Sequence, residues 1–272
     1  MIKDKFTLQW EAYNKGYIVW ELLLDSNRTN SYTKFIRENV KDKIVVECGA
    51  GTGYFSWLCA KYGAKKVYSC EQSINLCNDL KERFSDIDNI EVVHCDVFKD
   101  NLPKGDIYIH ELFGHTATGE GMYYFLHNCR RQNIKEIFPK YLNLVSCDFE
   151  TIPNKIPVSL DTFDDSNVED DLKDFLKLNN KEIDPKQCLY NYTYKINYAS
   201  KKDMFRGELL DILQLGLAIN PDKHFTYFEA GFDKENFYSS FAKKQNHWEI
   251  DKQKTHYYKQ NSMEYVREIN EF

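Results

Sequence analysis

The chain has 272 residues, a net charge of −6 at pH 7 and 42% hydrophobic residues. This is an ordinary globular composition, sufficient for one large domain or two modest ones. No apolar run is long enough to cross a bilayer, and the polar start M-I-K-D-K-F-T does not resemble a signal peptide. Lysine and arginine are dispersed, which argues against nucleic acid as the main ligand. We therefore expect a cytoplasmic protein without a membrane anchor.

The eight cysteines include no C-x-x-C pair. Several lie in apolar, strand-like runs, where a free thiol packs as a small hydrophobic side chain. Thiols of a cytoplasmic protein normally stay reduced. We expect structural cysteines and no metal site.

The first 40 residues have apolar side chains at helical spacing. Residues 8–24 and residues 31–40 are each predicted to form a helix. Residues 1–40 are therefore interpreted as an N-terminal helical segment.

After residue 40, short β-branched runs alternate with helical patterns. Predicted strands span residues 43–48, 66–70, 90–95, 106–110 and 141–146, and predicted helices span 55–62, 73–84 and 122–137. Alternating strands and helices form parallel βαβ units. Residues 41–148 are therefore predicted to form an α/β, Rossmann-like, doubly wound sheet, with the run at 141–146 as its fifth strand.

The alternation stops after about residue 148. Pro153 and Pro157 interrupt the chain, and tyrosine-rich, strand-like runs follow at 190–198, 224–232 and 255–258. This pattern predicts a smaller antiparallel, β-barrel-like domain over residues 149–272. The acidic stretch at 161–174 is interpreted as a solvated loop, with attraction of a basic substrate as the alternative.

A predicted strand runs into a glycine-rich turn at residues 43–53, K-I-V-V-E-C-G-A-G-T-G. Gly49, Gly51 and Gly53 allow the backbone to approach a ligand closely. Glu71 lies 20 residues past Gly51 at the end of the next strand, where an acid accepts both hydroxyls of a ribose. The pattern suits an adenosine cofactor; a tight turn with no ligand is the alternative.

Two glutamates bracket the segment that follows the predicted strand at 106–110. Glu111 and Glu120 are nine positions apart in E-L-F-G-H-T-A-T-G-E. Two buried carboxylates repel each other unless a cation lies between them, and the planar fork of a guanidinium fits two carboxylates at once. The pair therefore indicates a guanidinium site, whereas two glutamates facing solvent are the alternative for the pair alone.

Four separated segments, in order, resemble the protein arginine methyltransferases, a class I S-adenosylmethionine-dependent family. The segments are Q-W-E-A-Y at 9–13 with D-S-N-R-T at 25–29, the glycine loop with its continuation to Glu71, the segment from Glu111 to Glu120, and N-H-W at 246–248. The stretch D-P-K-Q at 184–187 also resembles part of the family's β-barrel.

The resemblance implies S-adenosylmethionine as cofactor and methyl transfer to the guanidinium of arginine in a protein or peptide. The cofactor-binding residues that it implies are Tyr13, Arg28, Glu47, Gly49, Gly51, Gly53, Glu71 and Asp96. Glu111 and Glu120 would hold the guanidinium and Trp248 would line the arginine channel. His247 with Asp25 would carry away the proton. No metal is implied.

This sequence departs from the family's pattern at several positions. Asn246 stands where the family usually has threonine, and His110 precedes Glu111 where many members have serine. Only about residues 158–183 are available for the family's helical dimerisation arm, so we expect a reduced arm and a possible homodimer. Two alternatives stay open: a methyltransferase for free arginine, a small amine or a natural-product peptide, and a catalytically silent binding module.

Overall fold

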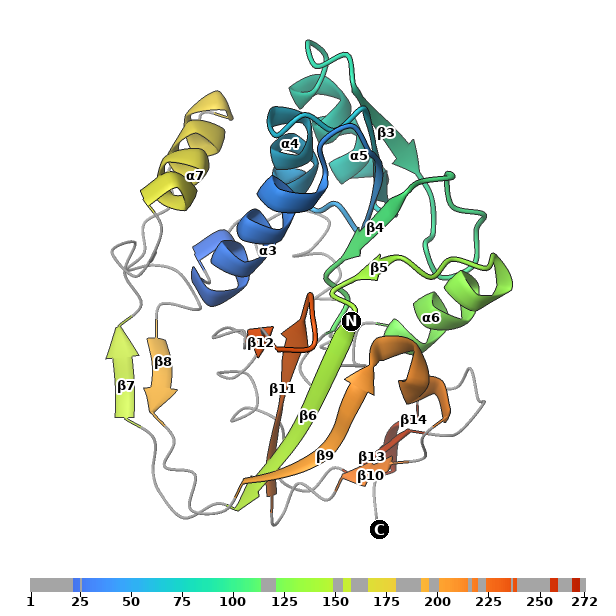
Figure 1. Cartoon of the computed structure of the whole chain (residues 1–272), viewed down its shortest axis with the longest axis vertical. Coiled ribbons are helices and arrows are strands. Elements are labelled where there is room, and N and C mark those ends of the chain that lie inside the picture. The colour runs from blue at the N-terminus through green and yellow to red at the C-terminus, as the bar shows by residue number, and fades with distance from the viewer. Residues whose placement is uncertain are drawn as a thin grey trace, which may run out of the picture. The chain divides into compact units, whose positions relative to one another are not determined.

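The computed structural model describes twelve stretches of the chain (Figure 1). They are residues 22–24, 26–113, 121–148, 154–157, 166–179, 192–195, 201–214, 217–219, 224–235, 237–238, 255–258 and 266–269. The chain divides into two units, one of Met1–His110 with Val158–Asn191 and one of Glu111–Pro157 with Tyr192–Phe272. Each unit therefore combines two separate stretches of sequence.

The parallel sheet has the strand order β3-β2-β1-β4-β5. Its strands are β1 (Ile44–Cys48), β2 (Lys66–Glu71), β3 (Ile90–His94), β4 (Ile107–His110) and the short β5 (Ile137–Phe138). β1 pairs in parallel with both β2 and β4, and β2 pairs in parallel with β3. The order reverses between β1 and β4, and α/β sheets bind their ligands beyond the carboxyl ends of the strands at such a switch point.

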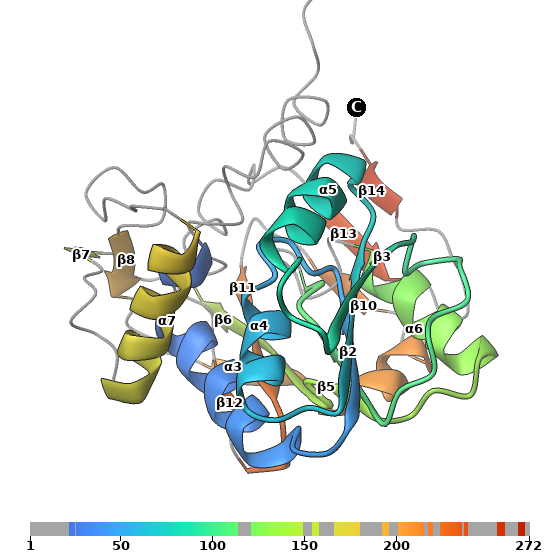
Figure 2. The ribbon, with the colours of Figure 1, turned by 90° about the horizontal axis from the view of Figure 1, so that it is seen from above.

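In the described residues of the first unit, the helices are α3 (Ser26–Asn39), α4 (Tyr54–Lys61), α5 (Ile74–Arg83) and α7 (Ser166–Leu178). α4 packs on β1, β2 and β3, and α5 packs on β2 and β3. α3 and α7 both lie against α4, as Figures 1 and 2 show. The predicted helix at 8–24 lies outside the described residues except for Leu22–Leu24, which form the 3-10 turn η1.

The strands of this unit can be predicted from the sequence because their residues are buried in continuous runs. Val45, Val46 and Cys48 of β1 are fully buried, and so are Val67 and Cys70 of β2. Parallel strands covered on both faces take β-branched and other apolar residues at successive positions. The first four predicted strands are confirmed to within one residue at either end.

The interpretation of the whole acidic stretch as a solvated loop is wrong, because Ser166–Leu178 form α7. Val168, Leu172 and Phe175 recur at helical spacing and are at most 1% exposed, so they fix one face of α7 against its own unit. Most of the acidic side chains then fall on other faces of the helix. Asp171 is the exception, since it is 4% exposed.

Asp171 is buried with two donors from the end of α4. Its carboxylate oxygens accept from Lys61 Nζ and from the Tyr62 hydroxyl, each at 2.6 Å. Burial followed by the hydrogen bond to Asp171 raises the pKa of Tyr62 to about 12. Next to this pair, the ring of Phe175 packs against Tyr54 and Trp57 at centroid distances of 5.1 and 5.4 Å. α7 is thus attached to α4 by both polar and aromatic contacts.

The second unit contains α6 (Met122–Arg131), the 3-10 helix η3 (Leu209–Gln214) and antiparallel strands. Four of them form a sheet in the order β12-β11-β6-β9, namely β6 (Tyr141–Asp148), β9 (Lys201–Glu208), β11 (His224–Gly231) and β12 (Phe237–Tyr238). Two smaller sheets pair β7 (Asn154–Pro157) with β8 (Tyr192–Lys195), and β13 (Thr255–Tyr258) with β10 (Leu217–Ile219) and β14 (Val266–Ile269). The predicted antiparallel character is confirmed, whereas a closed barrel stays a prediction.

The run at 141–146 is not the fifth strand of the parallel sheet, contrary to the prediction. It begins β6, which pairs antiparallel with β9 and β11. The predicted helix at 122–137 ends at Arg131, and Ile137–Phe138 supply the fifth strand instead. The two residues of β5 are too few to show the alternation of a strand. The longer strand-like run at 141–146, which belongs to β6, was therefore predicted as the fifth strand instead. The domain boundaries at residues 40 and 148 stay predictions.

The six cysteines in the well-described parts of the chain are buried and unbridged. Within the same parts, no group of His, Cys, Asp and Glu side chains could hold a metal ion. None of the described helices is both long and apolar enough to span a membrane.

Candidate active site

The glycine-rich turn connects β1 to α4 at the switch point of the sheet. Gly49, Gly51 and Gly53 have φ angles of 84°, 54° and 77°, in the left-handed region that favours glycine. The amides of Gly49 and Ala50 both donate to the carbonyl of Cys70 at 2.9 Å, which fixes the turn to the end of β2. Gly53 is the N-cap of α4.

The carboxylate of Glu71 holds this turn from the neighbouring strand. One oxygen accepts from the Gly51 amide at 2.9 Å, and the other accepts from the amides of Gln72 and Ser73 at 2.8 Å each. Glu71 is 1% exposed. The position predicted for ribose binding is therefore also a structural anchor of the glycine loop.

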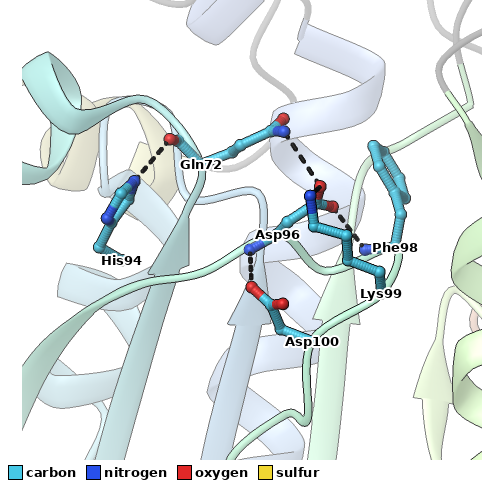
Figure 3. Close-up of polar contacts among 6 residues, drawn as sticks. All are labelled: Gln72, His94, Asp96, Phe98, Lys99 and Asp100. Atoms are coloured by element: carbon cyan, nitrogen blue, oxygen red, sulfur yellow. Dashed lines mark hydrogen bonds and ion pairs between the residues drawn. The ribbon is translucent and has the colours of Figure 1, made fainter.

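Asp96 lies just after β3, where its carboxylate organises a turn (Figure 3). It accepts from the Phe98 amide at 3.0 Å and from Gln72 Nε2 at 3.2 Å, and it pairs with Lys99 Nζ at 3.0 Å. The hydrogen bond and charge of Asp96 raise the pKa of Lys99. An adenine amino group that binds at Asp96 would therefore donate to a carboxylate that already accepts from three donors.

Gln72 ties the ends of β2 and β3 together. Its side chain donates to Asp96, and its carbonyl lies 3.0 Å from Nε2 of His94, the last residue of β3 (Figure 3). On the far side of the turn, the Asp96 amide donates to Asp100 at 2.8 Å. Gln72 was not predicted as a site residue, although it directly follows Glu71 in the sequence.

Glu47 is the buried acid of β1 and is 3% exposed. The hydroxyl of Ser56, on α4, donates to its carboxylate. Burial raises the pKa of Glu47 to about 8, although the hydrogen bonds from Ser56 and the charge of Arg28 act in the opposite direction. A carboxyl group in this environment is stabilised in its ionised form by any additional cation.

Arg28 is 7% exposed and lies on α3. Its Nη1 donates to the carbonyl of Leu22 at 2.8 Å, and its guanidinium lies 5.4 Å from the ring centre of Phe55. The same ring stacks on Tyr32 at 4.5 Å with an interplanar angle of 11°. α3 and α4 are therefore joined through aromatic and cation–π contacts beside the predicted cofactor residues.

Tyr32 also fixes the backbone directly before Glu111. Its hydroxyl donates to the carbonyl of His110 at 2.6 Å. In the sheet, His110 is the register partner of Cys48, the residue before Gly49. The glycine loop and the segment that begins at Glu111 thus leave adjacent strands at the same level. Tyr32 was not predicted, since on the sequence it is one of several aromatic residues on a helix.

Five of the predicted site residues lie outside the described residues: Tyr13, Asp25, Glu120, His247 and Trp248. The structure brings together the glycine loop, Glu71, Glu47 and Asp96 at the carboxyl end of the sheet. The roles assigned to all of these residues stay predictions.

Comparisons with known proteins match the same part of the chain. A family model described as "Ribosomal RNA adenine dimethylase" matches residues 22–133. Protein arginine N-methyltransferase 1 of Oryza sativa subsp. indica is 37% identical over 120 residues, which are 42% of this chain and 31% of the rice protein. The probable protein arginine N-methyltransferase 1.2 of Arabidopsis thaliana is 35% identical over 120 residues, covering 42% of this chain and 33% of that protein. Over this stretch, the chain is similar to protein arginine N-methyltransferases.

A third relative, from yeast, matches a similar share of this chain but a smaller share of its own length. Ribosomal protein arginine N-methyltransferase rmt3 of Schizosaccharomyces pombe is 34% identical over 126 residues, covering 44% of this chain and 23% of that protein. In all three relatives the matched stretch spans about a third or less of the relative's own length.

Solved structures of the same family share the fold over more of the chain. The Trypanosoma brucei PRMT1 enzyme-prozyme heterotetrameric complex with AdoHcy has a TM-score of 0.51 at 21% identity, covering 85% of this chain and 78% of that chain. The structure of PRMT6-SAH gives a TM-score of 0.51 at 16% identity, covering 83% and 85%. At these identities the likeness shows the fold, and the Rossmann-like class I methyltransferase sheet is confirmed.

Proposed function

We propose that this chain transfers a methyl group from S-adenosylmethionine to the guanidinium of an arginine in a protein or peptide. The observation that carries the proposal is the pairing of Cys48 with His110. Through this pairing, the glycine loop and the segment of Glu111 leave neighbouring strands at the switch point. Relatives that are 34–37% identical over this region are named as arginine methyltransferases.

The residues at the carboxyl end of the sheet fit the proposed cofactor. Two of the similar structures are described as containing AdoHcy or SAH. Glu71 ends β2, at the position where an acid accepts from ribose hydroxyls, and its carboxylate also holds the glycine turn through the Gly51 amide. Bound S-adenosylmethionine would supply a methyl group on a positively charged sulfur. Its ammonium and sulfonium charges would compensate the buried Glu47, while Arg28 would pair with its carboxylate.

Glu111 and Glu120 would act on the acceptor. An arginine guanidinium is protonated at neutral pH and is a poor nucleophile. Two carboxylates that bind its fork would localise the positive charge and leave one terminal nitrogen with more lone-pair character. Most of the rate enhancement would come from positioning and from charge compensation. His247 with Asp25 would remove the proton that the methylated nitrogen must lose.

The acceptor could instead be adenine, because the matching family model is described as an RNA adenine dimethylase. The net charge of −6 and the lack of a basic tract argue against it, since RNA affinity depends on neutralising phosphates. Free arginine or a small amine is a further alternative acceptor. A catalytically silent binding module would bind the cofactor product without any turnover.

One experiment separates these functions. The protein is incubated with S-adenosylmethionine and, in separate reactions, an arginine-rich peptide array, free arginine and an adenine-containing RNA, and the products are measured by mass spectrometry. We expect methylated arginine in peptides. Methylation of only the RNA or only free arginine would contradict the proposal, and binding of S-adenosylhomocysteine without any turnover would indicate the silent module.

Three variants test the assigned roles in the same assay. Glu111→Gln and Glu120→Gln should each lower turnover by roughly 10²–10³-fold, with nearly unchanged affinity for S-adenosylhomocysteine by calorimetry. Glu71→Ala should weaken that affinity first. Full activity of Glu120→Gln would show that the two glutamates do not form a guanidinium clamp.

A further inference from the structure

The helix α5 contacts the glycine-rich turn through a residue that the proposed function does not use. Arg83, the last residue of α5, donates from Nη1 to the carbonyl of Thr52 at 2.6 Å. Thr52 lies between Gly51 and Gly53 and is 6% exposed. Arg83 and Thr52 are 31 positions apart in the sequence, so the bond depends on how α5 lies against the turn.

The packing of α5 directs Arg83 toward this carbonyl. Leu80 and Phe84 are its neighbours on the same face of the helix, and both are at most 4% exposed. Their side chains fill the space beside Gly53, where a methyl group would clash with both. The apolar contacts at Gly53 therefore bring the guanidinium to the carbonyl one residue earlier in the turn.

The peptide unit between Thr52 and Gly53 is thereby held at both ends. Its carbonyl accepts from Arg83, and its amide, on Gly53, donates to the carbonyl of Ala50 at 2.8 Å. The carbonyl and the amide of a trans peptide point in opposite directions, so the two bonds together fix the orientation of the plane. Glycine adopts positive and negative φ with similar ease. The φ of +77° at Gly53 therefore depends on these partners rather than on the residue alone.

The charge of Arg83 makes this bond a strong one. Burial lowers the pKa of Arg83, while the charges of Asp79 and Glu82 act in the opposite direction. An arginine nevertheless stays protonated at neutral pH. A part-buried guanidinium needs acceptors from the protein in place of water, and a hydrogen bond from a charged donor is stronger than one between neutral groups.

We propose that Arg83 is a positioning residue of the candidate active site. Its guanidinium holds the Thr52 carbonyl and so fixes the next peptide unit in the orientation of the glycine-rich turn. Arg83 then acts on cofactor affinity through the backbone, a consequence that rests on the proposed function. Because the segment of Glu111 follows a different strand, β4, we expect cofactor binding rather than acceptor binding to depend on Arg83.

Amide exchange measured by NMR tests the contact without any ligand. The isotope-labelled full chain is compared with Arg83→Met, which keeps an apolar stem but has no donor, and with the matched control Lys81→Met, which removes an exposed cation from the same helix. The Gly53 amide should exchange about tenfold or more faster in Arg83→Met and at the wild-type rate in Lys81→Met. Unchanged exchange at Gly53 in Arg83→Met, or equal acceleration in Lys81→Met, overturns the proposal.

Calorimetry with S-adenosylhomocysteine and steady-state rates with a peptide acceptor test the effect on the site. Arg83→Met should bind about tenfold or more weakly at unchanged stoichiometry, and KM for S-adenosylmethionine should rise while kcat stays close to that of the wild type. Loss of folded protein would instead lower the stoichiometry and kcat at unchanged affinity, which would overturn the positioning role. Arg83→Lys should recover part of the affinity, because its ammonium can donate to the same carbonyl.

Two further results have a defined meaning. If Arg83→Met does not fold, Arg83→Gln replaces it with the same expectations, because its shorter amide does not reach the carbonyl of Thr52. Wild-type affinity in the folded variant overturns the positioning role. A wild-type protein that does not bind S-adenosylhomocysteine would refute the proposed function instead, while amide exchange at Gly53 would still decide whether Arg83 fixes the turn.

Discussion

At Gly53, both the backbone conformation and the surrounding packing oppose a side chain, which makes Gly53→Ala a quantitative test of how the glycine-rich turn is built. Its φ of +77° is a conformation that side chains rarely adopt. A methyl group at Gly53 would also lie 2.5 Å from Cδ2 of Leu80 and 2.6 Å from Cζ of Phe84. Normal carbon contacts are about 3.5–4.0 Å, so the side chains of Leu80 and Phe84 would have to move.

The two costs can be estimated separately. The left-handed backbone costs a residue with a side chain roughly 1–2 kcal/mol. Overpacking of a well-filled interior costs roughly 1–3 kcal/mol. We therefore expect Gly53→Ala to lower the free energy of unfolding by about 2–5 kcal/mol.

Two other glycines separate these costs experimentally. Gly63 has a φ of +85°, and a methyl group there would meet only Cγ of Lys41, at 3.7 Å. Gly63→Ala therefore carries the backbone cost alone. Gly105 lacks a positive φ, and its methyl group would lie 2.7 Å from Cγ2 of Val46 and 3.1 Å from the carbonyl oxygen of Ile44. Gly105→Ala therefore carries the packing cost alone.

Urea unfolding and S-adenosylhomocysteine binding are measured for all three variants. The loss of unfolding free energy in Gly53→Ala should be close to the sum of the losses in Gly63→Ala and Gly105→Ala. Gly53→Ala should also bind S-adenosylhomocysteine most weakly, because Gly53 lies in the turn that directly follows β1. If Gly53→Ala were no less stable than Gly63→Ala, the close packing of α5 behind the loop would be refuted. Normal ligand binding by a folded Gly53→Ala would refute the assignment of this turn to the cofactor.

Two further predictions concern buried charges. Asp171→Asn should cost roughly 1.5–3 kcal/mol in urea unfolding, because Lys61 and Tyr62 lose a charged acceptor. The control Asp174→Asn should stay within about 1 kcal/mol of wild type, since Asp174 is 56% exposed and 3.5 Å from Lys61; equal effects would contradict the role of Asp171. Burial raises the pKa of Glu47 from 4.5 to about 8, so the folded chain keeps a proton that the unfolded chain loses, and stability falls as the pH rises through this window. Glu47→Gln should reduce that fall by up to about 1.4 kcal/mol per pH unit between pH 5 and 8, and an unchanged slope would contradict it.

The first unit was predictable where burial is continuous and local. Val45, Val46 and Val67 lie in runs that fill both sides of a parallel strand. β5 was not predicted, because two residues are too few to show the alternation of a strand. The run that begins β6 was predicted as the fifth strand instead. The helix α7 was not predicted, because attention to its acidic composition hid three apolar residues at helical spacing, Val168, Leu172 and Phe175.

In the candidate site, the sequence identified residue types but not their partners. The glycines and Glu71 were found from spacing, whereas the bond from Gly51 to Glu71 depends on how the two strand ends meet. The contact of Tyr32 with His110 joins residues 78 positions apart, and no local pattern encodes it. The shared turn of Gln72 and Asp96 likewise exists only once β2 and β3 are adjacent.

The attachment of α7 to α4 has a consequence for the order in which the chain can fold. Lys61 and Asp171 are 110 positions apart, and the second unit begins between them. During synthesis, Tyr54 and Trp57 of α4 lack their ring contacts with Phe175 until α7 has left the ribosome. A fragment that ends before residue 166 would keep every strand from β1 to β4 and would still lack these ring contacts. The first unit therefore cannot be obtained complete as one continuous N-terminal piece.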